Sequence, residues 1–145
     1  MKLTAALLFI AATAFAAPPV ALEDLLSPPF PSQLMAAPSG NRVAWLANAE
    51  GARNIWIADA PDFQGRQLTS YAGDTGIEIG EASFTPDGQS IVFTRGGDLD
   101  TNGENTNPTH EPETPEQAVW IVSVRDGATR KIAEGNSPEV SPRGD

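Results

Sequence analysis

Six consecutive residues between Asp98 and Gly103 have the residue types of a calcium-binding turn. Asp98, Asp100 and Asn102 alternate, so their side-chain oxygens can converge on one cation, while Gly103 permits the sharp turn that follows. The twelfth position of such a loop is Thr109, where a bidentate glutamate would be needed. Two interpretations therefore stay open: a calcium site, or a polar hairpin whose Gly, Asn and Asp serve turn geometry alone.

Acidic residues gather around this turn. From Asp74 to Glu116 there are ten acids and one base, Arg95. Such a segment is either a set of solvated loops or a field that attracts peptide amines or a cation. His110, the one histidine, lies in the same Pro-rich loop, where a solvated side chain is the ordinary expectation.

The remaining residue types limit the chemistry further. The chain has no cysteine and a formal net charge of −10, which excludes thiolate catalysis and disulfides and argues against nucleic-acid binding. A serine nucleophile on a Gly-x-Ser-x-Gly turn is also missing. The nearest match, residues 135–139, ends in Glu139 instead of glycine. We therefore expect no catalytic residue and no cofactor in this chain, the calcium turn aside.

The first residues have the pattern of an export signal. Met1 and Lys2 precede 13 uncharged residues, and Ala14-Phe15-Ala16 places small residues where a signal peptidase reads them. The apolar run is shorter than the ~20 residues that span a bilayer. We expect cleavage between Ala16 and Ala17 and a periplasmic or secreted protein without a membrane anchor; the alternatives are an uncleaved N-terminal anchor or a buried helix.

A repeat follows. Residues 35–45 match residues 83–93 at an offset of 48, with the proline, the glycine and an apolar triplet aligned. Residues 54–58 match residues 118–122 at an offset of 64, and residues 67–69 match 131–133 at the same offset. A third unit opens at Val140. Self-similarity at 40 to 50 residues is typical of a repeat array.

Each unit is expected to form four short strands. The second strands are predicted at 42–47 and 90–95, the third at 54–58 and 118–124, and the outer edge strands at 65–69 and 129–133. The near-continuous apolar third strands suit a sheet covered on both faces, and four strands per unit at this period predict a propeller blade. The alternative is an antiparallel sandwich with a chance self-match.

The predicted fold class is thus all-β: a partial β-propeller with two four-stranded antiparallel blades and the start of a third. The expected division is a signal peptide at 1–16, a lead-in segment at 17–33, blade 1 at 34–80, blade 2 at 81–137 with a loop insertion at 96–117, and the start of blade 3 at 138–145. Trp56 and Trp120 should occupy equivalent places in the core. Because propellers close with about four to eight blades, we expect outer faces that leave Trp45, Trp56, Phe93 and Trp120 partly covered, and a chain that is the N-terminal piece of a longer protein.

Several segments also resemble a known family. Residues 24–32 with 37–40, 53–58, 66–69, 83–88, 95–98 and 103–108 are similar to the start and first two blades of exported prolyl oligopeptidase-family serine peptidases, in the acylaminoacyl-peptidase and dipeptidyl-peptidase branch. The resemblance implies a propeller that packs on a C-terminal α/β-hydrolase domain of the same protein and restricts entry to short peptides. The alternative is a non-enzymatic, TolB-like periplasmic propeller that binds a protein partner, since the Pro-Asp-Gly turn is common to both.

Overall fold

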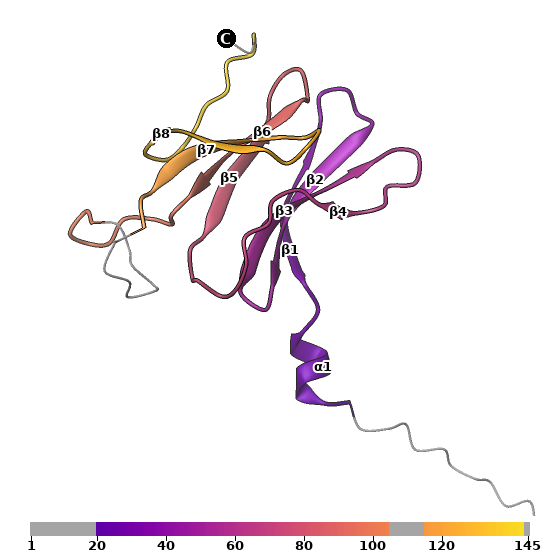
Figure 1. Ribbon diagram of the computed structural model, residues 1–145, viewed down its shortest axis with the longest axis vertical. Coiled ribbons are helices and arrows are strands. Elements are labelled where there is room, and N and C mark those ends of the chain that lie inside the picture. The colour runs from indigo at the N-terminus through magenta and orange to yellow at the C-terminus, as the bar shows by residue number, and fades with distance from the viewer. Residues whose placement is uncertain (1–19, 105–114, 144–145) are drawn as a thin grey trace, which may run out of the picture.

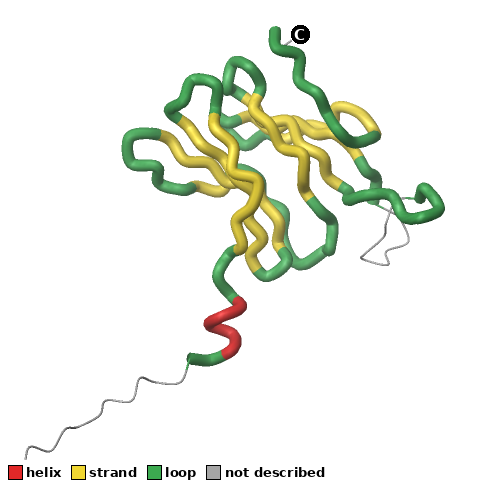
Figure 2. The backbone as a smooth tube through the Cα atoms, turned by 180° about the vertical axis from the view of Figure 1, so that it is seen from behind, coloured by secondary structure: helices red, strands yellow, loops and turns green. Residues whose placement is uncertain are grey.

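The computed structural model describes residues 20–104 and 115–143, which fold into two four-stranded antiparallel sheets (Figures 1 and 2). The first sheet has the order β1-β2-β3-β4 and the second the order β5-β6-β7-β8, so within each sheet every strand pairs with its neighbour in the chain. The strands are β1 (Phe30–Ala36), β2 (Arg42–Ala49), β3 (Ala52–Asp59), β4 (Arg66–Gln67), β5 (Ile79–Phe84), β6 (Ser90–Arg95), β7 (Ala118–Ser123) and β8 (Thr129–Glu134). A short helix, α1 (Leu22–Leu26), precedes them and buries none of its residues.

The strand register confirms the repeat. Trp45 pairs with Trp56 across β2 and β3, and Phe93 pairs with Trp120 across β6 and β7. Trp56 and Trp120 therefore occupy the same place in two separate sheets, as the offsets of 48 and 64 predict. The second and third strands lie where the sequence places them. β1 begins at Phe30, within the stretch expected to lead into the first unit.

The first hairpin turn is also repeated bond for bond. The N–H of Gly40 donates to the carbonyl of Ala37, and the N–H of Gly88 donates to that of Thr85, each at 2.8 Å. Gly40 has φ +76° and Gly88 has φ +66°, in the left-handed region that glycine enters without steric cost. The Pro-x-Gly pattern thus encodes the same turn twice.

The first strands of the two units, β1 and β5, each contain a bulge at the same repeat position. The register shifts between Ser32 and Met35 in β1 and between Gly80 and Ser83 in β5. Inside these bulges Gln33 has φ +48° and Glu81 has φ +49°. Non-glycine residues seldom adopt this conformation, so its recurrence at an offset of 48 is independent support for a structural repeat.

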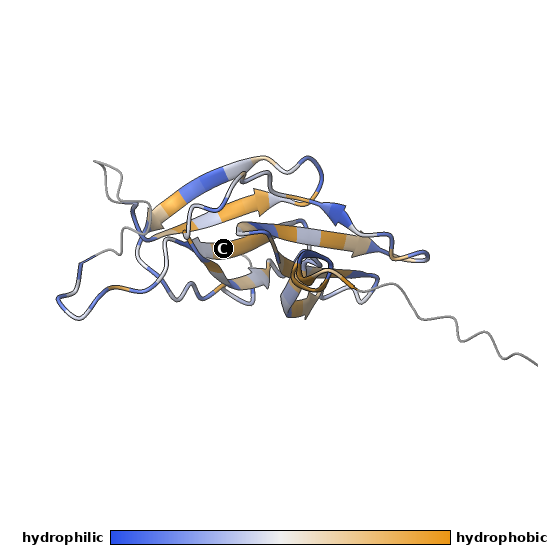
Figure 3. Ribbon diagram, turned by 90° about the horizontal axis from the view of Figure 1, so that it is seen from below, coloured by the Kyte–Doolittle hydropathy of each residue, from blue (hydrophilic) through white to orange (hydrophobic). Residues whose placement is uncertain are grey.

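The core lies between one face of the first sheet and one face of the second. We call this face of the first sheet its trailing face and this face of the second sheet its leading face. The equivalent faces of the other sheet take the same names, so the outer face of the first sheet is its leading face. The first sheet contributes the side chains of Met35, Ala44, Leu46, Ile55, Ile57 and Leu68. The second contributes Ile79, Ala82, Phe84, Ile91, Phe93, Trp120, Val122 and Val124. In Figure 3 the strands carry most of the hydrophobic colour and the loops most of the hydrophilic colour, as expected for sheets that meet face to face.

The burial of the aromatic residues corrects one expectation. Phe93 is 0% exposed instead of partly covered, because its face of the second sheet lies against the first. Trp56 and Trp120 are partly buried, in agreement with the expected partial cover, and Trp120 packs against the core. Trp45, on the leading face of the first sheet, is also partly buried and stacks on Trp56 with ring centroids 6.3 Å apart.

Candidate functional site

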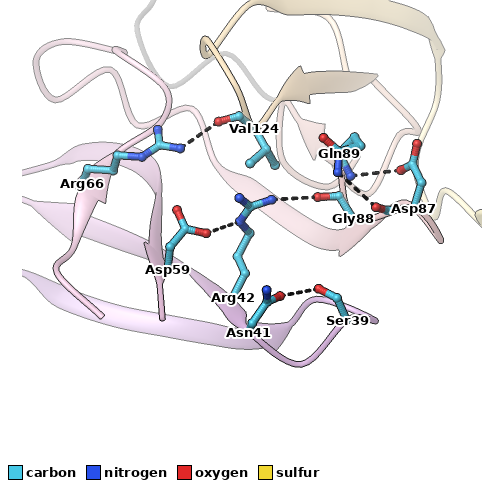
Figure 4. A network of polar contacts seen from close by, with 9 residues as sticks. All are labelled: Ser39, Asn41, Arg42, Asp59, Arg66, Asp87, Gly88, Gln89 and Val124. Carbon is cyan, nitrogen blue, oxygen red and sulfur yellow. Dashed lines mark hydrogen bonds and ion pairs between the residues drawn. The ribbon is translucent and has the colours of Figure 1, made fainter. Parts of the chain in front are cut away.

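Polar contacts join the two sheets near the first hairpin of the second unit (Figure 4). The guanidinium of Arg42, at the start of β2, donates to the carbonyl of Gly88 at 3.1 Å and pairs with the Asp59 carboxylate at 2.5 Å. Arg66 of β4 donates to the carbonyl of Val124 at 2.8 Å. A charged donor on a carbonyl forms one of the stronger hydrogen bonds, so two arginines fix the position of the second sheet on the first.

The carbonyls of Gly88 and Val124, which accept these bonds, lie in parts of the backbone that recur in both units. Ala60 donates its N–H to Asn41 at 2.9 Å, and Val124 donates to Gln89 at 3.0 Å, which is the same bond in successive units. Ala60 therefore corresponds to Val124, and by the offset of 64 Arg66 corresponds to Arg130. In the described part of the chain, the Arg130 guanidinium forms no hydrogen bond or ion pair, although the backbone of Arg130 pairs with Ile121 in β7. The sequence analysis missed the equivalence of Arg66 and Arg130, although the repeat offset of 64 relates the two positions.

At the other end of the strands, a cleft of about 290 Å³ lies between the sheets. Its lining residues are Phe30, Ser32, Leu46, Ala47, Asn48, Arg53, Asn54, Glu78 and Ile79. Arg53 donates to the Gly51 carbonyl at 3.1 Å and lies 3.7 Å from the Asp74 carboxylate. The cleft thus has a mixed polar and apolar lining, and its arginine makes one hydrogen bond and one ion pair within the protein.

Asn54, at the base of the cleft, organises the connection between the sheets. Its amide donates to the Tyr71 carbonyl and accepts from the Tyr71 N–H, both at 2.8 Å, and it also accepts from the Thr69 hydroxyl at 2.9 Å. Asn54 is 5% exposed and Thr69 is 3% exposed, so these bonds replace water. Alanine stands at both counterparts in the second unit, positions 118 and 133. This network is a further feature that the sequence analysis missed.

Tyr71 itself lies between the sheets. The Arg95 guanidinium is 4.5 Å from the centre of its ring, within the range of a cation–π contact. Its hydroxyl is buried and has no hydrogen-bond partner among the described residues. Burial raises the pKa of this hydroxyl, and the nearby Arg95 charge offsets part of that effect. Tyr71 therefore stays neutral near pH 7.

The predicted calcium turn is an exposed loop after β6. The Asp100 carboxylate accepts from the backbone N–H groups of Asn102 at 2.8 Å and Glu104 at 2.9 Å. Hydrogen bonds from Glu104 and then Asn102 lower the pKa of Asp100. This is an Asx-type turn, and within the described residues no cluster of three or more His, Cys, Asp or Glu side chains has a metal-binding arrangement. Calcium binding by Asp98, Asp100 and Asn102 stays a prediction; Thr109 and His110 lie outside the described residues.

Glu81, one of the acids in this region, has a defined role. Its carboxylate accepts from the Thr94 hydroxyl at 2.6 Å, from the Ser137 N–H at 2.7 Å and from the Ser137 hydroxyl at 3.0 Å. Bonds from Thr94 and Ser137 lower the pKa of Glu81, and burial opposes them weakly. Gln33, its counterpart in β1, accepts from the Ala82 N–H at 3.3 Å. In both units the bulge residue therefore binds the backbone at the start of the next unit.

The order and register of the strands confirm an all-β chain with two four-stranded sheets stacked as in a partial β-propeller. No protein-family model and no curated protein match the chain. Among solved structures it is similar to TolB from Acinetobacter baumannii, with 21% sequence identity and a TM-score of 0.38. The match covers 77% of this chain and 35% of the TolB chain. In residues 20–104 and 115–143 no helix has the length and hydrophobicity to cross a membrane.

Proposed function

We propose that the chain is the N-terminal propeller region of an exported serine peptidase that acts on short peptides. Its role would be to pack against a hydrolase domain of the same protein and to restrict access to that domain, without supplying catalytic residues. The observation that carries this proposal is the family resemblance of segments that lie in the strands and hairpins of the two sheets. Residues 53–58 lie in β3, residues 66–69 include β4, and residues 83–88 form the end of β5 and its hairpin.

The contacts between the sheets support a packing role. The arginine bonds to Gly88 and Val124 hold the two units in one orientation, and rigid sheets suit a barrier that admits a substrate by size. Three acidic residues, Glu78, Glu81 and Asp98, line a second hollow of about 240 Å³. A negative lining there would favour the positively charged amino end of a short peptide.

The test is to read the gene beyond codon 145 and to assay its full product. The proposal predicts several further blades and then a Gly-x-Ser-x-Gly motif, on the order of 400 residues downstream. The full product should cleave short peptide substrates and react with a fluorophosphonate probe at that serine. A reading frame that ends after its last blade, with no labelled serine, would instead favour the TolB-like propeller that binds a protein partner.

Export is part of the proposal and is tested separately. N-terminal sequencing of the protein recovered from the periplasm or medium should begin at Ala17. Retention of residues 1–16 on a membrane-bound product would contradict it.

A further inference from the structure

The cleft of about 290 Å³ lies between the two sheets, so both of its walls belong to the described part of the chain. The first wall is the end of β2 and the start of β3, with Asn48 and Arg53, and the second is the start of β5 with the preceding Glu78. Apolar side chains, among them Leu46 and Ile79, are part of the lining. Small-molecule sites usually measure roughly 300–1,000 Å³. The cleft is just below this range, so it has room for a molecule the size of an amino acid or a dipeptide.

Arg53 is held in place at the first wall of the cleft. Its Nη1 donates to the Gly51 carbonyl at 3.1 Å and lies 3.7 Å from Oδ1 of Asp74, which is longer than a charge-assisted hydrogen bond. Gly51 is fixed in turn, because its N–H donates to Oδ1 of Asn48 at 2.8 Å and because a Cβ at this position would overlap the Asp74 carboxyl. Within the described residues, Nε and Nη2 of Arg53 have no acceptor. This side of the guanidinium therefore keeps its donors for a ligand, and their planar arrangement matches a carboxylate.

Glu78 contributes a negative charge to the same cleft. Its backbone carbonyl accepts from the Gly96 N–H at 3.1 Å, which fixes the residue at the start of the second sheet. Its exposed carboxylate, by contrast, forms no hydrogen bond or ion pair within residues 20–104 and 115–143. Arg53 lies beside Asp74 instead, so the charge of Glu78 is not compensated by the arginine of the cleft. A ligand with an ammonium group would compensate it and would form a charge-assisted hydrogen bond.

The internal repeat indicates that the sheet itself does not require these polar residues. The second unit forms the same sheet with other residues at these positions: Gln117 for Arg53, Gly96 for Asn48 and Ala118 for Asn54. In the first unit, Asn54 binds both backbone groups of Tyr71 and so ties the connection that leads to Glu78 to the base of the cleft. Polar groups that the repeat does not need, and that converge on one cavity, are typical of a binding site.

We propose that this cleft binds a small zwitterion with an apolar side chain, either a free α-amino acid or a dipeptide. Arg53 binds the carboxylate of the ligand, Glu78 binds its ammonium group, and Leu46 and Ile79 contact its side chain. A molecule that carries only one of these charges leaves the other charged residue of the lining without a partner. The inference rests on the contact between the two sheets and is independent of the peptidase proposal.

The test is isothermal titration calorimetry with the product of the complete reading frame. Leucine and alanyl-leucine are the zwitterionic probes, N-acetylleucine lacks the ammonium group, and leucinamide lacks the carboxylate. Any reactive serine is first blocked with a fluorophosphonate, so that cleavage of alanyl-leucine does not contribute heat. We expect leucine or alanyl-leucine to bind with a Kd below about 1 mM, and the two singly charged probes to bind at least about tenfold more weakly. Whichever zwitterion binds more tightly identifies the ligand as an amino acid or a dipeptide.

Two variants assign each charge of the ligand to a residue. Glu78→Gln should weaken binding of the zwitterion about tenfold and leave N-acetylleucine unchanged; it should fold normally, because the carboxylate has no described partner. Arg53→Gln introduces the residue type of the second unit, and should weaken the zwitterion about tenfold and leave leucinamide unchanged. Arg130→Gln, which changes the exposed arginine of β8, is the matched control and should bind like the wild type.

Three results would overturn the inference. They are the absence of binding by either zwitterion at about 10 mM, wild-type affinity in Glu78→Gln or Arg53→Gln, and an equal loss of affinity in Arg130→Gln. A product without a reactive serine would contradict the peptidase proposal and would leave the binding result unaffected, so failure of the two proposals can be distinguished.

Discussion

Trp45 and Phe93 occupy the same position in two copies of one sheet, yet their surroundings differ completely. Phe93 is 0% exposed because its face of the second sheet lies against the first. Trp45 is partly exposed, since no second sheet of the described residues lies against its face. The residue pattern therefore decides which side chains point to a given face of the sheet, while the presence of a neighbouring sheet decides whether that face is buried. The two units can be compared as the same structure with and without that neighbour.

The largest expected effect tests this comparison directly. Phe93→Ala removes a fully enclosed ring and should lower the free energy of unfolding by about 3–5 kcal/mol. Trp45→Ala removes a larger ring that is partly exposed and should cost less, about 1–2 kcal/mol. Urea unfolding at low protein concentration, followed by circular dichroism, measures both. Because Phe93→Ala could unfold the chain, Phe93→Leu is included, with an expected loss of about 1–2 kcal/mol. Equal costs at positions 45 and 93 would contradict the comparison.

A second difference lies in the polar core. Asn54→Ala leaves both backbone groups of Tyr71 and the Thr69 hydroxyl without their partner, and should cost about 2–3 kcal/mol. In the second unit alanine stands at the counterpart, Ala118, so this network is specific to the first unit. Hydrogen exchange should show faster exchange of the amide of Tyr71 and of the amide of Ile55, which donates to the Thr69 hydroxyl, in Asn54→Ala. Protection equal to that of the wild type would show that the network does not hold this connection.

The next effect compares two arginines at the same repeat position. Arg66→Ala removes the bond to the Val124 carbonyl between the sheets and should cost about 1 kcal/mol, reduced by its partial exposure. Arg130→Ala should leave the free energy of unfolding of the chain unchanged within about 0.5 kcal/mol, as for other surface substitutions. Thermal unfolding of both variants at low concentration checks this. A larger loss of stability for Arg130→Ala would mean that its side chain has a partner within the chain.

Much of this fold could be predicted from the sequence, for identifiable reasons. The Pro-x-Gly turns and the apolar third strands are local signals, so the hairpins and the equivalence of Trp56 with Trp120 followed from them. Burial could not be predicted at the same level, because Trp45 and Phe93 differ only in what lies opposite them. The bulges at Gln33 and Glu81 carry no glycine to reveal their positive φ. The arginine contacts depend on backbone carbonyls, which leave no mark in the residue pattern.

The smallest expected effect concerns the bulge residues and pH. Hydrogen bonds from Thr94 and Ser137 lower the pKa of Glu81 below its ordinary 4.5. A carboxylate with a lowered pKa stabilises the fold fully above its unfolded pKa, and this contribution is lost as the pH falls through the folded value. The stability difference between wild type and Glu81→Gln should therefore be largest near pH 6–7 and should shrink below about pH 4.5. This stability difference is small, because Glu81 is exposed to solvent.

Gln33 provides the control, because it holds the next unit from the same bulge without a charge. Gln33→Ala should change the free energy of unfolding by an amount that is constant between about pH 3 and 7. Other acids with lowered pKa values, such as Asp87 and Asp126, titrate in both the variant and the wild type and cancel in the difference. A pH-independent cost for Glu81→Gln would show that shape, and not the carboxylate charge, fixes Ser137. The two bulges would then hold the next unit in the same way despite their different side chains.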